Sequence, residues 1–489
     1  MLRIKISKKF KKNIYKLSAF IAAVIIGLTA SIPAQAAKGP DYHAMAEERK
    51  NLPIQSNSYE NWPDGPAVSA QSAIVMDVNS GAVLYAKNID EKLYPASTTK
   101  ILTCLLAVEN AAMDEEVTFS YDAVFGVPRD GSNMGIDVGE ILPMEDCLYG
   151  ILVGSANEVA SAVGEHVGGD TETFLQMMND KAKELGCKNT NFMNANGLHD
   201  ENHYTTAYDL ALIARAFFSN DFLANIANTP RVHFTPTDTQ PDDFYLNNKN
   251  KLVSGEIKYQ YYMGGKTGYT NDARQTLVSC AEKDGMRLVC VVMKEETPDQ
   301  FNDTVTLFNY GFSNFKKINV SSIETKYTIE NTGFYQTGQD IFGSSKSILQ
   351  LDNKSYIVVP TAAEFADVES TISYENLLPN QVAAIDYTYN DIFVGRVAVN
   401  LAANTEVYDF SESTPTQNDV TIVNVKAIIL WILAIAILLC LGLFLAKYIN
   451  HYHLGGKKGR MAKRRRRRTA QRTVSPYRNF NFDDIDLRR

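Results

Sequence analysis

The sequence predicts an α/β domain with a mixed, mostly antiparallel sheet and a helical cluster, then a small all-β domain and one C-terminal transmembrane helix. Three observations support this prediction. Strand-like segments open and close residues 67–316 around a helix-rich centre. Residues 317–410 contain alternating or β-branched runs between turn residues, with little helical period. Residues 427–446 contain no charged side chain.

Residues 1–36 are predicted to be a secretory signal peptide. Seven basic residues and no acid occupy its start, and the apolar run Leu17–Leu28 precedes a small-x-small cleavage pattern at Ala34-Gln35-Ala36. An uncleaved transmembrane helix is the alternative, but the apolar run is short for one. Residues 37–66 are polar and are interpreted as an extended lead-in.

Hydrophobic periodicity places the elements of the first domain. Period-two runs predict strands, and Asn79-Ser80-Gly81 and Asp284-Gly285 predict the turns of two hairpins. Apolar residues three and four apart predict helices. The expected elements are strands at 73–78, 82–86, 276–281 and 287–293, and helices around 101–108 and 174–185.

The C-terminal part is predicted to cross a membrane once. Residues 411–424 are rich in Ser, Thr, Pro and Asn and indicate a linker, and residues 425–447 form the membrane helix. Its 20 uncharged residues would span about 30 Å, one hydrocarbon core. Residues 448–489 are strongly basic, so the positive-inside rule predicts a type I protein with this tail in the cytoplasm. A buried core helix is the alternative.

The charge distribution argues against a nucleic-acid-binding ectodomain. The chain has a net charge of −8, whereas the leader carries seven positive charges and residues 447–489 a net eleven, which leaves −26 for the part between them. The run Lys463–Arg468 could bind nucleic acid, but contact with anionic lipid is the simpler interpretation.

The cysteine pattern indicates neither a metal site nor a dense disulfide framework. Five cysteines lie outside the membrane segment, an odd number, and none forms a Cys-x-x-Cys pair. Cys280 and Cys290 flank the predicted turn at Asp284-Gly285, and a disulfide between them is left open.

Ser97 and Lys100 are the first candidate catalytic pair. A serine at a helix start and a lysine three residues later share one helix face, so the lysine could take the serine proton if its pKa were lowered. The pattern alone is weak, because Ser97 could be a plain N-cap and Ser313–Lys316 is a second match.

Two further motifs strengthen the assignment. Ser155 and Asn157 place a hydroxyl and an amide two residues apart, and Lys266-Thr267-Gly268 precedes the closing strands. The order Ser-x-x-Lys, Ser-x-Asn, Lys-Thr-Gly resembles that of penicillin-binding proteins and serine β-lactamases. The flanking segments, 150–158, 196–198 and 203–210, make residues 67–312 similar to the low-molecular-weight D-alanyl-D-alanine carboxypeptidases, and the resemblance extends faintly through the β domain.

The resemblance implies a role for each motif residue. Ser97 would be the nucleophile and Lys100 its general base, while Ser155 relays a proton and Asn157 holds the substrate. Lys266 and Thr267 would face the substrate, beside Gly268, which would let the substrate backbone approach closely. The backbone N–H groups of Ser97 and Tyr269 would form the oxyanion hole. No metal or other cofactor is expected, and His199 and His203 are interpreted as structural.

Four positions depart from the family pattern. Glu158 stands where aspartate is usual and Ala156 where glycine is frequent, and neither change removes a catalytic group. Gln300 occupies the position of an arginine expected to bind the substrate carboxylate. Arg274 stands where the family usually has glycine, and one hypothesis is that it replaces that guanidinium. The alternative is that Arg274 is an exposed turn residue and Lys266 alone binds the carboxylate.

The function implied is a serine D-Ala-D-Ala carboxypeptidase that trims peptidoglycan stem pentapeptides through a Ser97 acyl-enzyme. β-Lactam antibiotics would be covalent inhibitors, membrane lipid would surround the C-terminal helix, and no nucleic acid would be bound. Two rivals remain. A β-lactamase would need a carboxylate to activate water, for which Glu172 is the candidate. A catalytically inactive wall-binding anchor would label with penicillin without releasing D-alanine.

Overall fold

A five-stranded sheet forms the centre of the first domain. The computed structural model describes residues 40–324, 349–375 and 381–401, with the single residues 16, 326 and 377. The strand order in the sheet is β2-β1-β9-β8-β7, and every neighbouring pair is antiparallel, so the expectation of a mixed sheet is wrong. The bounds are β1 Ser72–Asp77, β2 Val83–Lys87, β7 Tyr262–Thr270, β8 Arg274–Lys283 and β9 Met286–Glu295.

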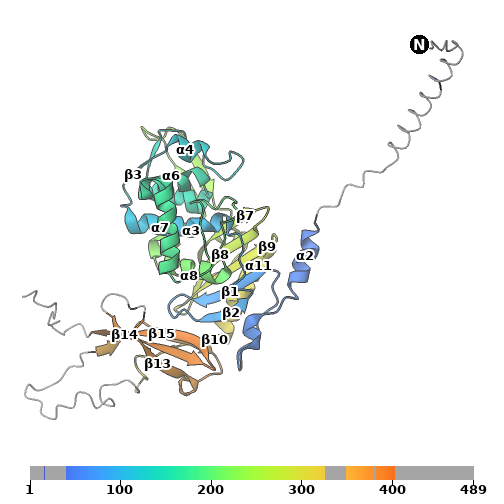
Figure 1. Ribbon diagram of the computed structural model, residues 1–489, viewed down its shortest axis with the longest axis vertical. Coiled ribbons are helices and arrows are strands. Elements are labelled where there is room, and N and C mark those ends of the chain that lie inside the picture. Colours follow the sequence, from blue (N-terminus) through green and yellow to red (C-terminus); the bar gives the residue numbers. More distant parts are fainter. Residues whose placement is uncertain are drawn as a thin grey trace, which may run out of the picture. The chain divides into compact units, whose positions relative to one another are not determined.

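A cluster of helices and short hairpins lies between β2 and β7 in the chain and covers one face of the sheet (Figure 1). Its helices are η2 Ala96–Thr99, α3 Lys100–Asn110, α4 Tyr121–Phe125, α5 Met144–Tyr149, η3 Gly150–Gly154, α6 Asn157–Gly168, α7 Thr171–Glu184, α8 Ala207–Phe218, α9 Asp221–Ala227 and α10 Lys251–Ser254. Its hairpins pair β3 Glu116–Thr118 with β4 Ile141–Pro143, and β5 Arg231–Phe234 with β6 Phe244–Asn247.

The sheet is buried on both faces. Along β1, Ile74 and Met76 point to the helical cluster, whereas Ala73 and Val75 point to the opposite face, as the period of two requires. Helix α8 packs on β1 and β9 from the first side, and α11 Asp299–Asn314 packs on β8 and β9 from the other.

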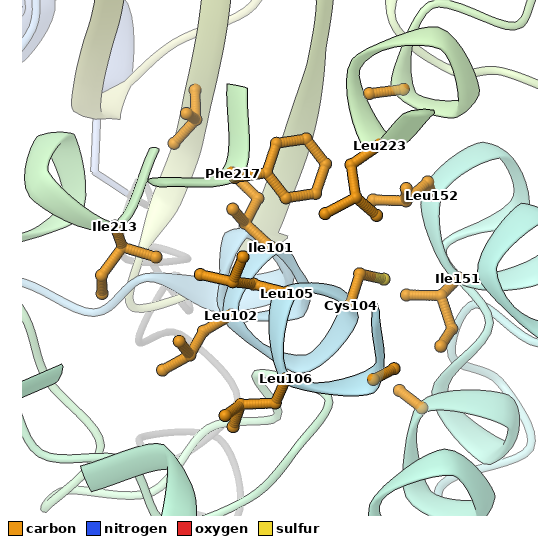
Figure 2. Packing of buried hydrophobic residues seen from close by; sticks show 14 of the residues in the cluster. Ile101, Leu102, Cys104, Leu105, Leu106, Ile151, Leu152, Ile213, Phe217 and Leu223 are labelled. Atoms are coloured by element: carbon orange, nitrogen blue, oxygen red, sulfur yellow. The ribbon is translucent and has the colours of Figure 1, made fainter. Parts of the chain in front are cut away.

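Helix α3 is the central helix of the cluster. Its apolar residues lie within a shell contributed by the turn before α6 and by α8 and α9 (Figure 2). The labelled residues of this core are Ile101, Leu102, Cys104, Leu105, Leu106, Ile151, Leu152, Ile213, Phe217 and Leu223. Because α3 is enclosed by apolar side chains, its N-terminal residue is held in a fixed position.

The turn residues predicted from the sequence connect the strands as expected. Asp284 and Gly285, both with positive φ, join β8 to β9 in the two-residue turn that matches strand twist. Cys280 on β8 and Cys290 on β9 point to opposite faces of this hairpin. Cys280 pairs with Val289 and Cys290 with Ser279, so the two side chains lie on opposite faces of the sheet. Both thiols are free, and the disulfide left open is excluded.

The β-rich part begins where α11 ends. β10 Phe315–Asn319 pairs with β12 Tyr356–Pro360, and a second sheet has the order β11-β15-β14-β13. Both sheets are antiparallel, as an all-β segment requires. The division of this segment from the rest of the chain as a separate domain stays a prediction. The second sheet contains β11 Leu349–Leu351, β13 Glu369–Ser373, β14 Gln381–Tyr389 and β15 Ile392–Leu401, and a 3-10 turn η5 covers Phe365–Asp367.

The described part of the lead-in is not extended. It contains helix α2, Tyr42–Arg49, and the 3-10 turn η1, Gln55–Ser58. Asp41 caps α2 by accepting a hydrogen bond from the N–H of Ala44. The sequence hid this helix because only Ala46 and Arg49 on it are buried. Arg49 is buried through its polar contacts, with Nε 2.9 Å from the carbonyl oxygen of Ser69.

The predicted signal peptide 1–36, linker 411–424, membrane helix 425–447 and tail 448–489 lie outside the described residues, apart from Lys16. Within the part of the chain that is described, no single helix is long and apolar enough to cross a membrane. Helices α8 and α9 meet the length and composition test only as a pair bent by 108°.

Candidate active site

The three predicted motifs meet at the edge of the sheet. Ser97 lies in η2, Lys100 begins α3, Asn157 begins α6, and Lys266 lies on the edge strand β7. Lys100 Nζ is 3.2 Å from Ser97 Oγ and 2.7 Å from Asn157 Oδ1. Lys266 Nζ is 2.9 Å from Ser155 Oγ. The residues predicted from the sequence therefore form two linked lysine–serine pairs.

Two glycines let the chain pass close to Ser97. A Cβ on Gly268 would lie 2.9 Å from the carbonyl oxygen of Pro95 and 3.0 Å from the nitrogen of Ser97. A Cβ on Gly197 would lie 1.9 Å from the carbonyl oxygen of Ala96. Gly268 was expected to admit the substrate backbone, but its open side is occupied by the turn that carries the nucleophile. Ala96 itself has φ +50°, a strained conformation next to the reactive serine.

Lys100 has the environment of a neutral amine. It is fully buried, and its pKa is lowered well below the ordinary lysine value, first by burial and second by the charge of Lys266. Its Nζ lies 2.5 Å from the carbonyl oxygen of Asn196 and 2.7 Å from Asn157 Oδ1, both of which can only accept. A neutral amine would donate its two N–H bonds to these oxygens, leaving the lone pair for the third neighbour, the Ser97 hydroxyl.

Ser155 and Asn157 follow an irregular stretch of backbone. The π-helical turn Gly150–Gly154 ends at Ser155, which has φ +62°. The N–H of Asn157 then donates to the carbonyl oxygen of Ser132 at 2.9 Å. Glu158 accepts from the N–H groups of Met134 and Gly135, at 2.5 and 3.1 Å. Its longer side chain thus anchors the loop beside Asn157, and the change from aspartate leaves the wall intact.

Lys249 is a charged neighbour of Lys266 that the sequence analysis missed. Burial and the charge of Lys249 lower the pKa of Lys266 to about 7. Lys249 is exposed, and its Nζ lies 3.1 Å from Ser132 Oγ, with no carboxylate partner among the described residues. The only sequence signal was its place in Asn248-Lys249-Asn250, where Asn250 caps α10. Lys249 and the protonated form of Lys266 therefore concentrate positive charge on this side of Ser155.

The described geometry is compatible with an oxyanion hole at Ser97 and Tyr269. Ser97 lies in the first turn of η2, where backbone N–H groups lack intrahelical acceptors. Tyr269 is on β7, the edge strand, half of whose backbone groups face away from β8. Gly268 brings these two segments into contact.

Three other candidates from the sequence are a buried histidine and two exposed side chains. His203 is buried, with Nε2 2.8 Å from Thr99 Oγ1, and burial lowers its pKa to about 4. Ser313 is exposed, and its motif partner Lys316 binds Glu364 at 3.1 Å. Glu172 is exposed in the first turn of α7.

Arg274 forms a two-pronged ion pair with Glu296. Its Nε and Nη2 lie 3.1 and 2.7 Å from the two carboxylate oxygens of Glu296, and Nη1 lies 3.1 Å from Tyr269 Oη. Its guanidinium also stacks over the ring of Tyr42 on α2, at 3.6 Å. Gln300 is buried in the first turn of α11, where Nε2 contacts Thr297. The carboxylate-binding role of Arg274 stays a prediction.

The Arg274→Ala variant tests this role. Its removal leaves buried Glu296 with only Arg49, at 3.5 Å, so we expect a loss of more than about 2 kcal/mol of stability. If Arg274 also binds the substrate carboxylate, KM for a peptide should rise strongly. Glu296→Gln is the matched control, because it breaks the same pair and keeps the guanidinium. A KM within about twofold of the wild-type value in Arg274→Ala, about 0.4 kcal/mol, would rule out the binding role.

Comparisons with known proteins identify a family, related sequences and a related structure. Residues 59–297 match the family described as D-alanyl-D-alanine carboxypeptidase. D-alanyl-D-alanine carboxypeptidase DacF of Bacillus subtilis is 36% identical over 256 residues, covering 51% of this chain and 64% of that protein. DacB2 of Mycobacterium tuberculosis is 33% identical over 267 residues, covering 53% of this chain and 87% of that protein. The structure of penicillin binding protein 5 from Haemophilus influenzae has a TM-score of 0.52 and 25% identity, covering 69% of this chain and 98% of that chain.

Proposed function

This chain belongs to the D-alanyl-D-alanine carboxypeptidase family of serine peptidases, and we propose that it removes the terminal D-alanine from peptidoglycan stem pentapeptides through an acyl-enzyme on Ser97. The observation that carries the proposal is the position of Lys100. Its Nζ contacts the Ser97 hydroxyl, two oxygen acceptors fix its N–H groups, and burial favours its neutral form.

Acylation begins with proton transfer from Ser97 Oγ to Lys100 Nζ. The oxygen attacks the carbonyl carbon of the terminal D-Ala–D-Ala bond, and the N–H groups of Ser97 and Tyr269 stabilise the oxyanion. One such donor typically contributes about 3–4 kcal/mol. Ser155, 2.9 Å from Lys266 Nζ, relays to the leaving nitrogen the proton that Lys100 took from Ser97, which returns Lys100 to its neutral form. D-alanine departs, and water then hydrolyses the ester and returns the proton to Ser97.

The positive charges of Lys266 on β7 and of Lys249 orient the substrate. The terminal carboxylate binds beside Lys266 and Thr267, and Lys249 adds a second positive charge at the same end. Asn157 Oδ1 already accepts from Lys100, so its Nδ2 group is available to a substrate carbonyl. A β-lactam presents an acylating carbonyl and a carboxylate with similar spacing and therefore acylates Ser97.

The test is D-alanine release from a pentapeptide and from a cross-linked dimer, measured side by side. Release from the pentapeptide, with slow turnover of bound penicillin, supports the proposal. Rapid penicillin turnover would instead indicate a β-lactamase, although Glu172 is exposed on α7. Penicillin labelling without D-alanine release would indicate a binding protein.

We further propose that the chain is a type I membrane protein, exported by residues 1–36 and held by residues 425–447. The support is compositional: the uncharged segment and the basic tail beyond it. A chain ending after Phe410 should be secreted as a soluble, active enzyme. Sedimentation of this shortened protein with membranes would show that another segment is the anchor.

A further inference from the structure

Helix α2 directs one face at an ion pair beside the edge strand of the active site. Tyr42, Ala46 and Arg49 are spaced four and three residues apart, so they share one face of the helix. The guanidinium carbon of Arg274 lies 3.6 Å from the centre of the Tyr42 ring. At the other end of the helix, Arg49 Nη2 lies 3.5 Å from Glu296 Oε1. The two ends of this face therefore contact the two partners of the Arg274–Glu296 pair.

The ion pair is shielded from water and linked to β7. The side chains of Arg274 and Glu296 are 14% and 6% exposed. Two guanidinium nitrogens donate to the carboxylate, and the third, Nη1, donates to the Tyr269 hydroxyl at 3.1 Å. The ring of Tyr42 packs against the plane of the same guanidinium. Arg274 is thus fixed by groups from α2, from β7 and from the segment that follows β9.

The backbone of Arg274 depends on these contacts. Arg274 has φ +53°, in the left-handed region, where a residue with a side chain is strained. Such a conformation persists only when surrounding contacts determine it, and strained residues cluster at active sites. Arg274 opens β8 opposite Thr270, the residue after Tyr269. The side-chain contacts of Arg274 therefore help to set the backbone on both sides of the β7–β8 turn.

This stretch of β7 lies next to the nucleophile. Gly268, the residue before Tyr269, packs against the nitrogen of Ser97 so closely that a Cβ would lie 3.0 Å from it. A donor of an oxyanion hole must be held in place before the reaction, because its contribution depends on geometry. A misplacement of about 1 Å caused far from the reacting atoms can lower a rate by about 10²-fold.

We propose that α2 is a positioning element for the reaction, in which Tyr42 acts through Arg274 on Tyr269. The ring of Tyr42 holds the guanidinium, the guanidinium holds the Tyr269 hydroxyl, and the backbone N–H of Tyr269 is thereby kept at the oxyanion hole beside Ser97. This inference rests on the proposed function, from which it takes the role of Tyr269. Tyr42 is a positioning residue, because it acts on the reaction through Arg274 and Tyr269.

The experiment compares Tyr42→Ala with the wild type in D-alanine release from a pentapeptide and in the rate of acylation by penicillin. Both kcat and the acylation rate should fall about tenfold, or about 1.4 kcal/mol in activation free energy. KM should change less than about twofold, because the oxyanion forms only during the reaction. Tyr42→Phe keeps the ring and should restore most of the activity. His43→Ala is the matched control, because His43 is the next residue on α2 and is exposed.

A double-mutant cycle tests whether Tyr42 acts through Tyr269. Tyr269→Phe removes the hydroxyl that accepts from Arg274 and keeps the backbone N–H. In this background, Tyr42→Ala should lower kcat by less than about threefold, because residues that act through one contact are not additive. The exposed position of the Tyr269 ring makes this background a better choice than Arg274→Ala, which unpairs Glu296.

The outcomes separate this inference from the proposed function. Wild-type kcat and acylation rate in Tyr42→Ala, or an equal loss in the wild-type and Tyr269→Phe backgrounds, overturn the positioning role while the proposed function stands. A lower melting temperature with unchanged kcat overturns it as well, because it shows a purely structural role. A wild-type protein that releases no D-alanine overturns the proposed function, and the rate of penicillin acylation then decides the role of Tyr42. A wild-type protein that penicillin does not acylate overturns both.

Discussion

Ser97→Ala should abolish covalent labelling by penicillin and lower D-alanine release by about 10⁴-fold or more, because the nucleophile acts as a unit with its base. The fold should persist. The Ser97 hydroxyl contacts Lys100 at 3.2 Å, and the turn is held by neighbouring groups, so we expect a stability change within about 1 kcal/mol. Labelling is read by gel fluorescence with a tagged penicillin, and folding by thermal unfolding.

Ser313→Ala is the matched control for the Ser97 variant. Ser313 belongs to the second Ser-x-x-Lys match, but it is exposed and Lys316 binds Glu364. This variant should label like the wild type. Labelling that survives in Ser97→Ala and disappears in Ser313→Ala would contradict the assigned site.

Replacing Lys100 with arginine should lower kcat/KM by about 10²- to 10⁴-fold, the usual contribution of a general base. Arginine stays protonated throughout this pH range and therefore cannot accept the Ser97 proton. The activity of the wild type requires neutral Lys100, and its lowered pKa populates that form at lower pH than for an ordinary lysine. Activity should therefore fall as the pH decreases through the pKa of Lys100.

The alkaline side of the pH profile should report on Lys266. The protonated form binds the substrate carboxylate, and the pKa of this lysine in the free enzyme is about 7, so kcat/KM should decline as the pH rises past that value. Lys266→Arg should move this decline to higher pH and keep the acidic limb.

An Lys100→Arg enzyme with a wild-type pH profile and wild-type kcat/KM would exclude Lys100 as the base.

The catalytic residues could be predicted because each one belongs to a short motif with its own local structure. Ser97 and Lys100 share a helical turn, and Lys266 to Gly268 lie on one strand, so the spacing within each motif already constrains its geometry. The contacts between motifs, such as Lys100 with Asn157, depend on packing between distant segments. The resemblance to a known family supplied those expectations.

The missed features depend on tertiary contacts that leave little pattern in the sequence. Helix α2 has almost no apolar stripe, and one of its two buried residues is Arg49, whose Nε donates to the carbonyl oxygen of Ser69. A helix held by such a polar contact leaves no hydrophobic period in the sequence. Lys249 gains its importance only from its distance to Lys266. The register of β8 and β9 decides that Cys280 and Cys290 face opposite sides, and a shift of one residue would have reversed this. Arg274 gained a buried partner, Glu296, that spacing could not predict.

The most direct test of the central claim is to locate the acyl group itself. Protein treated with penicillin is denatured in acid, digested and analysed by tandem mass spectrometry, and pentapeptide-treated protein is quenched and analysed in the same way. We predict one adduct for each reagent, on the peptide that contains Ser97. An adduct on Ser155 or another residue, or D-alanine release without any adduct at Ser97 under conditions that trap penicillin there, would contradict a Ser97 acyl-enzyme.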